Sequence, residues 1–260
     1  SLVIGTALVG GSIPPDWIAT LTEAARAGLN IVAGLHTRLT GIPELGAAAA
    51  EGGAQLIDVR TAPADLPVAT GIKRSGLRLL TVGTDCALGK KYTALQLERD
   101  MRAAGLSADF RASGQTGIMI AGEGIPIDCV VADFISGAAE VLSPENEPDH
   151  WDVIEGQGGI FHPGYAAVSH GLLIGSQPDA FVVCHAAGRT EIEGWPHVPL
   201  PSIGDVIERT VQIGRLTNPA IRCVGISVNT SSLPETERRE YLARLGKRYG
   251  LPAVDPLLTE

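Results

Sequence analysis

The chain has 260 residues, enough for one large domain or two modest ones. Hydrophobic residues make up 45% of it, yet no apolar run approaches the ~20 residues that cross a bilayer, so we expect no membrane-spanning segment. The net charge is −9 and the basic residues are scattered, which argues against a nucleic-acid partner. Four distant cysteines without C-x-x-C spacing argue against zinc and disulfides and favour a cytoplasmic location.

The first part of the chain alternates short apolar runs with helical patterns, which is typical of a parallel sheet flanked by helices. The pattern predicts three strands and two helices: strands at Leu2–Val9, Ile31–Gly34 and Leu56–Val59, and helices at Asp16–Ala27 and Pro43–Glu51. A linker is expected at Thr61–Ser75. The sequence opens at Ser1, directly in a strand pattern and without Met, so we expect the natural protein to extend further upstream. Residues 1–75 are therefore predicted to form a partial N-terminal domain with its linker.

Residues 76–260 continue the same alternation and are predicted to form the second domain. Its expected strands are Leu77–Val82, Trp151–Ile154, Ala180–Cys184 and Cys223–Val228. Its expected helices are Lys90–Ala104, Val130–Leu142, Tyr165–Ile174, Asp205–Leu216 and Pro234–Tyr249. The fold class predicted for the whole chain is α/β.

The segment from Gly83 to Lys90 predicts a phosphate-binding loop, because a strand, a glycine-bounded loop and a helix that opens with Gly-Lys follow one another. The first amides of such a helix lack partners and attract an anion, and the lysine adds a charge. The loop departs from the usual pattern twice. Thr84 stands at the first glycine position, and Lys91 stands where a Ser or Thr would hold Mg²⁺. Thr93 is too far along the helix to be assumed a substitute.

Two further glycine-rich turns are expected at the same edge of the sheet. Glu155 ends an apolar strand and is followed by Gly156-Gln157-Gly158-Gly159, so its carboxylate should face the same crevice as Lys90. The segment Ser113–Gly117 follows another strand and is interpreted either as a ligand-binding turn or as a plain one. A solvated turn carboxylate is the alternative for Glu155.

The ordered motifs GTDCALGK, SGQTG, EGQGGIFHPGY and GWPHVPLPS resemble the D-glutamate N-acetyltransferase family. The resemblance covers essentially the whole chain and includes the GLNIVAGLH segment that ends at His36. It implies a P-loop NTPase-like domain preceded by a smaller Rossmann-like α/β domain, here truncated at its N-terminus. A more distant likeness of the loop and of EGQGG is to dethiobiotin synthetase.

The resemblance implies acetyl transfer from acetyl-CoA to the amino group of D-glutamate or a similar D-amino acid. We expect the cofactor phosphates to meet the two turns that carry Gly83, Thr84, Asp85, Cys86, Gly89, Lys90, Lys91, Gly114, Gln115 and Thr116. Direct acyl transfer needs no hydroxyl to hold Mg²⁺, so Lys91 fits this activity and no metal is expected.

The remaining roles rest on the chemistry that the reaction requires. Glu155 and His162 are both candidates for the base, and Tyr165 either donates to an oxyanion or caps a helix. Arg189 is expected to bind a substrate carboxylate, or else to form a surface ion pair. Trp195-Pro196-His197 is expected to rigidify a lid or ligand wall. The predicted substrate-binding residues are Arg189, Gln157 and His197. We treat His36 as structural, along with His170.

Two other functions stay open at the level of sequence. An ATP-dependent ligase, with Asp85 and Glu155 holding Mg²⁺, explains the loop but leaves Lys91 unexplained. A regulatory module that binds a nucleotide or CoA explains the loop but not the polar residues at several strand ends. A small-molecule substrate and a homodimer or higher homo-oligomer are expected with the enzyme.

Overall fold

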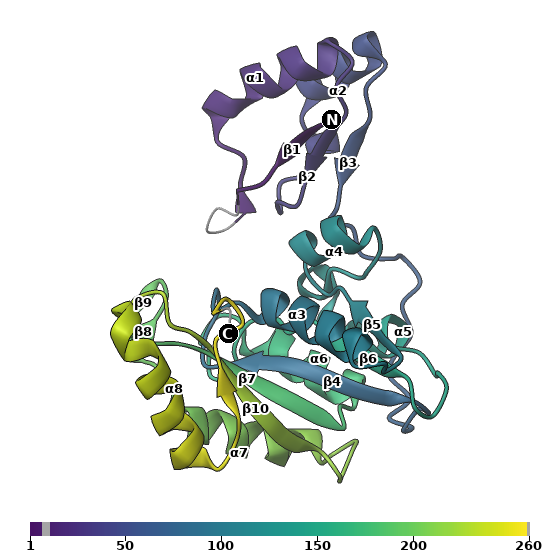
Figure 1. Ribbon diagram of the computed structural model, residues 1–260. Helices are drawn as coiled ribbons and strands as arrows, with labels where there is room; N and C mark the ends of the chain where they lie inside the picture. The colour runs from purple at the N-terminus through teal and green to yellow at the C-terminus, as the bar shows by residue number, and fades with distance from the viewer. Residues whose placement is uncertain (7–10, 259–260) are drawn as a thin grey trace.

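A computed structural model describes residues 1–6 and 11–258, which form two α/β units, each built on a sheet of parallel strands (Figure 1). The N-terminal unit has a three-stranded parallel sheet in the order β1 (Leu2–Ile4), β2 (Ile31–Ala33), β3 (Leu56–Asp58). Helices α1 (Pro15–Arg26) and α2 (Pro43–Gly52) pack on this sheet. Both begin with a proline, whose missing N–H costs nothing in the first turn.

The first strand is shorter than the sequence pattern predicts, because β1 ends at Ile4. Residues 7–9 of the predicted strand lie outside the described residues. The small core of this unit is formed by side chains from both helices and the sheet, among them Leu21, Ile31 and Leu45.

The second unit is built on a six-stranded sheet whose paired strands are all parallel, in the order β11-β10-β7-β4-β6-β5. The strands are β4 (Leu77–Gly83), β5 (Ala108–Arg111), β6 (Trp151–Ile154), β7 (Ala180–Ala186), β10 (Arg222–Asn229) and β11 (Ala253–Val254). The helices are α3 (Lys90–Ala103), α4 (Gln115–Ala121), α5 (Ile135–Leu142), α6 (Ala166–Ser176), α7 (Ile203–Gly214) and α8 (Glu235–Tyr249). A β-hairpin, β8 (Glu191–Ile192) with β9 (Trp195–Pro199), stands outside the sheet. Short 3₁₀ turns lie at Leu39–Gly41, Ile127–Cys129 and Ala132–Phe134.

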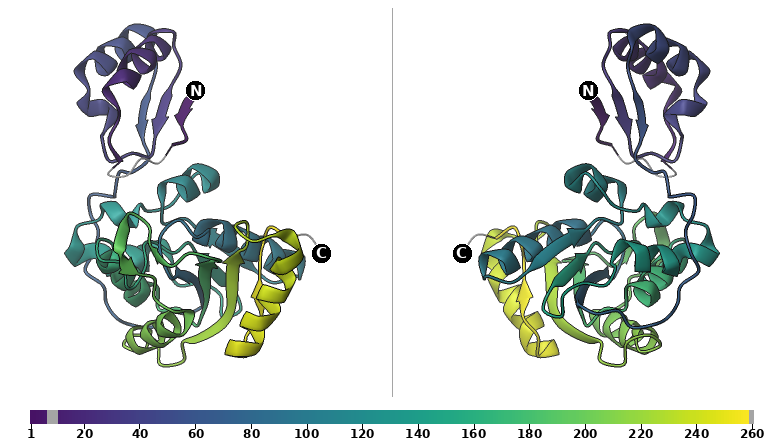
Figure 2. Two further views of the ribbon diagram at one scale, coloured as in Figure 1. Left: turned by 90° about the vertical axis from the view of Figure 1, so that its left-hand side faces the viewer. Right: turned by 90° about the vertical axis from the view of Figure 1, so that its right-hand side faces the viewer.

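Alternate residues of the central strands face two different helix layers, as the two-residue period of a strand requires. Leu79 packs in the cluster that includes Ala94 of α3, whereas Leu80 packs with residues of α5, α6 and α7. The two rotated views in Figure 2 show these helices on opposite faces of the sheet. The core of the chain therefore lies on both sides of β4, the strand that leads into the phosphate loop.

Two further predicted segments differ from the structure. The helix expected at Val130–Leu142 begins only at Ile135, after a 3₁₀ turn at Ala132–Phe134. Val130 and Val131 stay extended, in keeping with the weak helix propensity of β-branched residues. The turn expected at Ser113–Gly117 ends at Gly114, and Gln115 already opens α4.

The predicted linker is fastened to the second unit. The backbone N–H groups of Thr70 and Gly71 donate to Glu140 of α5 at 2.9 and 3.0 Å. The Arg74 guanidinium donates to the carbonyl oxygens of Ser143 and Gly175 at 2.8 and 2.9 Å. Because Thr70, Gly71 and Arg74 are bound to the second unit, the chain between Asp58 and Thr70 connects the two sheets.

A buried arginine closes the amino-terminal end of the large sheet. Arg78 is 0% exposed, and its Nε donates to Ser143 Oγ at 2.8 Å. Ser143 Oγ in turn donates to the buried carboxylate of Asp152 at 2.6 Å. The guanidinium also donates to backbone carbonyls of both neighbouring turns, including Ser75 and Pro144.

Among residues 1–6 and 11–258, no helix has the length and apolar character needed to span a bilayer.

Candidate active site

The phosphate loop joins the end of β4 at Gly83 to the start of α3 at Lys90. Gly89 caps the helix with a φ of +96°, a left-handed conformation that glycine adopts without a steric penalty. The free amides of the first turn of α3 therefore point out of the loop, as the motif predicts. This turn creates an anion-binding position at the carboxyl end of the central strand.

A cavity of about 430 Å³, here called the P-loop cavity, opens beside this turn. Its walls are the loop residues 86–92, residues 115–116 of α4, and residues 155–158 after β6. Lys90 is buried, and its Nζ donates to the backbone oxygen of Asp85 at 2.7 Å. Burial lowers the pKa of Lys90. Lys91 also lines the cavity, so two lysines face the position expected for phosphate.

No threonine or serine side chain of the α3 first turn faces the P-loop cavity in the described structure. Thr93 is buried, and its Oγ1 lies 2.8 Å from Ser227 Oγ and 3.5 Å from Cys184 Sγ. The hydroxyl therefore points into the sheet. The substitution by Lys91 at the usual Mg²⁺ position is not compensated by Thr93.

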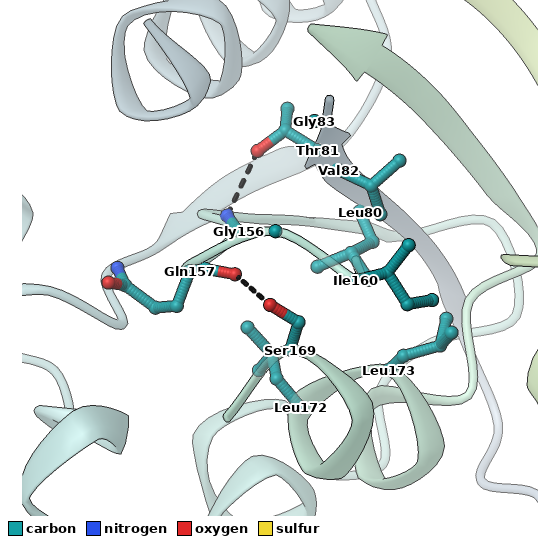
Figure 3. Close-up of a pocket in the computed structure, with 11 residues that line it drawn as sticks. Leu80, Thr81, Val82, Gly83, Gly156, Gln157, Ile160, Ser169, Leu172 and Leu173 are labelled. Atoms are coloured by element: carbon teal, nitrogen blue, oxygen red, sulfur yellow. Dashed lines mark hydrogen bonds between the residues drawn. The ribbon is translucent and has the colours of Figure 1, made fainter. Parts of the chain in front are cut away.

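The loop after β6 is pinned to the end of β4 (Figure 3). The Gly156 N–H donates to Thr81 Oγ1 at 2.9 Å, and Ser169 Oγ donates to the Gln157 carbonyl at 2.7 Å. A Cβ on Gly156 would lie 1.6 Å from the Thr81 carbonyl oxygen, so only glycine fits there. The space of about 20 Å³ behind this loop has room for about one water and belongs to the core.

Glu155 is held in the P-loop cavity by the second glycine-rich turn. Its Oε2 accepts the N–H groups of Ser113 and Gly114 at 3.1 and 3.0 Å, and its side chain is buried. Burial raises the pKa of Glu155 to about 7, although the two amides, Lys91 and Lys90 act in the opposite direction. Glu155 is thus a carboxyl group that exchanges a proton near neutral pH. Gly114 supplies an amide to this carboxylate rather than to the cavity.

A second cavity of about 430 Å³, here called the interdomain cavity, lies between the two units and adjoins the first. Cys86, Ala87, Gln115, Gln157 and Gly158 line both cavities. A molecule in one cavity can therefore reach the other past these residues.

His162 lies on the wall of the interdomain cavity with 1% of its surface exposed. Its Nδ1 accepts the N–H groups of Gly164 and Tyr165 at 3.1 and 3.2 Å. Nδ1 must therefore be unprotonated, and the neutral ring carries its proton on Nε2. Burial lowers the pKa of His162 and favours this neutral form. The ring stacks on Tyr165 and meets the edge of Trp195, with centroid distances of 4.5 and 4.6 Å.

The Asp85 carboxylate forms hydrogen bonds that hold the phosphate loop in place. Its Oδ1 accepts the Cys86 N–H at 2.6 Å, and its Oδ2 accepts the Glu193 N–H at 2.9 Å. Arg189 donates from Nη1 to the same Oδ2 and to the Cys86 carbonyl, both at 2.9 Å, and lies 3.2 Å from the Glu193 carboxylate. Arg189 thus ties the phosphate loop to the β8–β9 hairpin.

Ligand atoms of Asp85, Cys86 and His162 lie within 4.8 Å of one another, close enough to share a metal ion. The donor set does not suit one, because Asp85 Oδ2 already accepts from the Glu193 N–H and from Arg189. In addition, Nδ1 of His162 accepts two N–H groups, and its Nε2 would have to lose its proton to bind a metal.

The other predicted residues fall into three groups. Gln115, Thr116, Gln157 and Tyr165 line one or both cavities. Gly83 and Thr84 are buried beneath the loop, where the Thr84 N–H donates to the Cys184 carbonyl at 3.1 Å. His197 is exposed on β9 and is not among the described residues that line either cavity. Trp195 of the same segment does line the interdomain cavity.

Sequence reasoning missed the contribution of the N-terminal unit. His36, treated as structural, lines the interdomain cavity together with Arg60 and Asp128. Arg60 directly precedes the predicted linker, and no recognisable motif surrounds it. Its position after β3, at the carboxyl end of a parallel strand, is the signal that could have identified it.

The fold and these cavities define the chain as a P-loop α/β protein with a Rossmann-like N-terminal unit. A family model described as a domain of unknown function (DUF1611_C), P-loop domain, matches residues 67–260. Its partner model, DUF1611_N, described as a Rossmann-like domain, matches residues 1–62. The chain belongs to the DUF1611 family.

Two curated relatives are named D-glutamate N-acetyltransferase, which confirms the resemblance predicted from the four motifs. One, from a Pseudoalteromonas species, is 50% identical over 99% of this chain and 77% of its own length. The other, from Tritonibacter scottomollicae, is 46% identical over 98% of this chain and 77% of its own length. The crystal structure of a DUF1611 family protein from Anabaena variabilis superposes with a TM-score of 0.89 at 39% identity, over 98% of this chain and 75% of that one.

Proposed function

We propose that this protein is an N-acetyltransferase that moves an acetyl group from acetyl-CoA to the amino group of D-glutamate. The observation that carries the proposal is the position of Glu155, a carboxyl group with a pKa of about 7, in the same cavity as the phosphate-loop amides. The names of the two curated relatives give the reaction and the amino acid.

The acetyl donor is proposed to bind with its phosphates at the phosphate loop. The first amides of α3 and the ammonium groups of Lys90 and Lys91 suit an anion there. The side chain of Thr93 is occupied by Ser227, so the loop lacks the hydroxyl that holds Mg²⁺ in nucleotide hydrolases. Acyl transfer has no use for that hydroxyl, and this difference favours CoA over Mg-ATP.

Glu155 is proposed as the base. The ammonium of an amino acid must lose a proton before its nitrogen can attack a thioester, and Glu155 can accept that proton directly or through water. The new N–C bond then forms as the C–S bond breaks, and the sulfur leaves as CoA thiol once it is protonated. A carboxyl group with a pKa of about 7 can take one proton from the ammonium and pass it to the sulfur, while the second proton that the nitrogen loses on becoming an amide is released to solvent.

His162 is proposed as a hydrogen-bond donor and not as the base. Its Nδ1 lone pair is occupied by two backbone N–H groups, and its Nε2–H is free to donate. Such a donor can stabilise the oxyanion that develops on the acetyl oxygen. Tyr165, stacked on the ring, is a second candidate for this role.

The ligase alternative has less support. It needs Asp85 and Glu155 as Mg²⁺ ligands, yet Asp85 Oδ2 and Glu155 Oε2 each already accept two N–H groups. The remaining predictions that go with the enzyme, a cytoplasmic location and a homodimer or higher homo-oligomer, stay proposals. The four free cysteines are compatible with a reducing compartment.

The test is a turnover assay with purified protein, acetyl-CoA and D-glutamate, with and without a metal chelator. We expect release of CoA thiol, and N-acetylglutamate in equal amount by mass spectrometry, unaffected by the chelator. Release of ADP or phosphate from Mg-ATP in place of this product would support the ligase instead. Tight binding of CoA without any product would support a regulatory module.

A further inference from the structure

The interdomain cavity carries an unassigned recognition site. Its lining comes from both units: Gly34, His36 and Arg60 from the N-terminal one, and Gln115, His162 and Trp195 from the P-loop unit. A volume of about 430 Å³ falls within the range of small-molecule sites. The cavity is thus complete only when the two units are together.

A buried donor without a partner indicates that the cavity receives a ligand. The Nε2–H of His162 has no hydrogen-bond partner in the described structure, and it lies 3.9 Å from Asp85 Oδ1, beyond hydrogen-bond distance. A buried N–H that stays unsatisfied costs about 1–3 kcal/mol. A ligand with an acceptor oxygen would remove this cost.

Among the described residues that line the interdomain cavity, Arg60 provides the one arginine or lysine charge. Its side chain is 14% exposed and is held from two sides. Nη1 lies 2.9 Å from Asp128 Oδ2 and also contacts His36 Nε2, while Nη2 donates to Gln115 Oε1 at 2.8 Å. Each Nη carries two N–H groups, so Nη2 has a second one without a partner in the described structure.

The acidic residues of the cavity do not prevent Arg60 from binding an anionic group of a ligand. Asp128 faces Arg60 itself, where it offsets the cost of burying the guanidinium and fixes its direction. Glu193 is 57% exposed and is paired with Arg189 at 3.2 Å. His36 Nε2 contacts Arg60 Nη1 on the same wall of the cavity.

The orientation of the bound amino acid follows from the position of the base. The amino group must reach Glu155 in the P-loop cavity, so the α-carbon lies at the boundary that Gln115 and Gln157 share. The side chain of the amino acid then extends into the interdomain cavity, toward Arg60. A planar guanidinium there matches a carboxylate better than an amide.

We propose that Arg60 of the N-terminal unit binds the side-chain carboxylate of the amino-acid substrate and sets the preference for an acidic one. This inference rests on the proposed acetyl transfer. Gln115 is a positioning residue, because it lines both cavities and its Oε1 accepts from Arg60 Nη2 and so fixes the guanidinium at their boundary. The Rossmann-like unit thereby supplies substrate specificity, and the P-loop unit supplies the acetyl donor site.

The experiment compares kcat/KM for D-glutamate and D-glutamine, which differ at the side-chain carboxylate alone. Arg60→Gln should lower the ratio of the two values by about tenfold or more, as expected for loss of a charge-assisted hydrogen bond. Arg60→Lys should retain part of the preference, because the charge stays and the planar fork is lost. The control is Arg26→Gln, an exposed arginine of α1 paired with Glu51, which should leave the ratio unchanged.

The alternative is that Arg60 only fastens the two units together through Asp128. In that case Arg60→Gln and Asp128→Asn would lower kcat/KM for both substrates equally, the ratio would stay at the wild-type value, and the inference would be overturned.

Failure of the proposed acetyl transfer is a separate outcome, visible as no turnover by the wild-type protein with either substrate. Calorimetric titration of D-glutamate and D-glutamine, without acetyl donor, then decides the inference. Tighter binding of D-glutamate that is lost in Arg60→Gln supports it, and equal affinities in both proteins refute it.

Discussion

Replacing Glu155 by glutamine tests the proposed base while nearly preserving its shape. The glutamine Oε1 can still accept the Ser113 and Gly114 amides, but the side chain can no longer take a proton. We expect kcat to fall by roughly 10²-fold or more. The affinity for acetyl-CoA should be retained, since the phosphate loop is untouched.

The pH profile gives this prediction a magnitude. With a pKa of about 7, only about a tenth of Glu155 is ionised at pH 6, so wild-type kcat/KM should fall about tenfold per pH unit below neutrality. Glu155→Gln should lack this limb, while the titration of the substrate amine at high pH remains in both proteins. Thiol release measured from pH 5 to 9 gives both profiles.

Near-normal kcat in Glu155→Gln, with the low-pH limb retained, would refute the assignment of Glu155 as the base. If His162→Ala alone then abolished turnover, the histidine would be the base.

The same carboxyl group should affect stability. Its pKa in the folded protein is raised from 4.5 to about 7, so folding favours its protonated form. The stabilising contribution is fully present below about pH 4.5 and is lost as the pH rises through about 7. The shift corresponds to about 3 kcal/mol above pH 7. Glu155→Gln should therefore resist urea better than wild type at pH 8, with the difference vanishing near pH 5. A variant less stable than wild type at pH 8 would contradict the burial argument.

Three further substitutions test other parts of the structure. Lys90→Ala should weaken acetyl-CoA binding about tenfold or more, from loss of an interaction worth roughly 1.5–3 kcal/mol, and an unchanged dissociation constant in calorimetry would show that the loop is a plain turn. Arg189→Lys should raise KM for acetyl-CoA at least as much as for D-glutamate, because Arg189 binds Asp85 and the phosphate loop. A rise in KM confined to D-glutamate would instead indicate that Arg189 binds a substrate carboxylate. Arg78→Ala should lower the free energy of unfolding by about 1–3 kcal/mol in urea, since Ser143 Oγ and the Ser75 and Pro144 carbonyls lose their buried donor, and an unchanged free energy would show that this network contributes little.

The α/β class and the phosphate loop could be predicted because each rests on local patterns. The apolar runs of β4, β6, β7 and β10 sit where buried parallel strands were expected, and α3 begins at Lys90 as the motif requires. Strand order could not be predicted, because it depends on pairing between segments far apart in the chain, such as β4 between β6 and β7. The division of the chain at residue 75 stays a prediction.

The site was only partly predictable for the same reason. Glu155 could be placed beside Lys90 because both follow strands of one parallel sheet. The bond that occupies Arg189 joins residues 104 positions apart, and the one between Arg60 and Gln115 spans 55. The proton position on His162 depends on two backbone amides of its own turn, which no residue pattern displays.

The most direct test of the proposed acetyl-CoA site is a calorimetric titration of the protein with acetyl-CoA and, separately, with Mg-ATP, each repeated with a chelator present. We expect acetyl-CoA to bind more tightly than Mg-ATP, with an affinity independent of Mg²⁺, because Lys91 replaces the hydroxyl that holds the metal and Thr93 faces the sheet. Tight, Mg²⁺-dependent binding of ATP with negligible affinity for acetyl-CoA would contradict it.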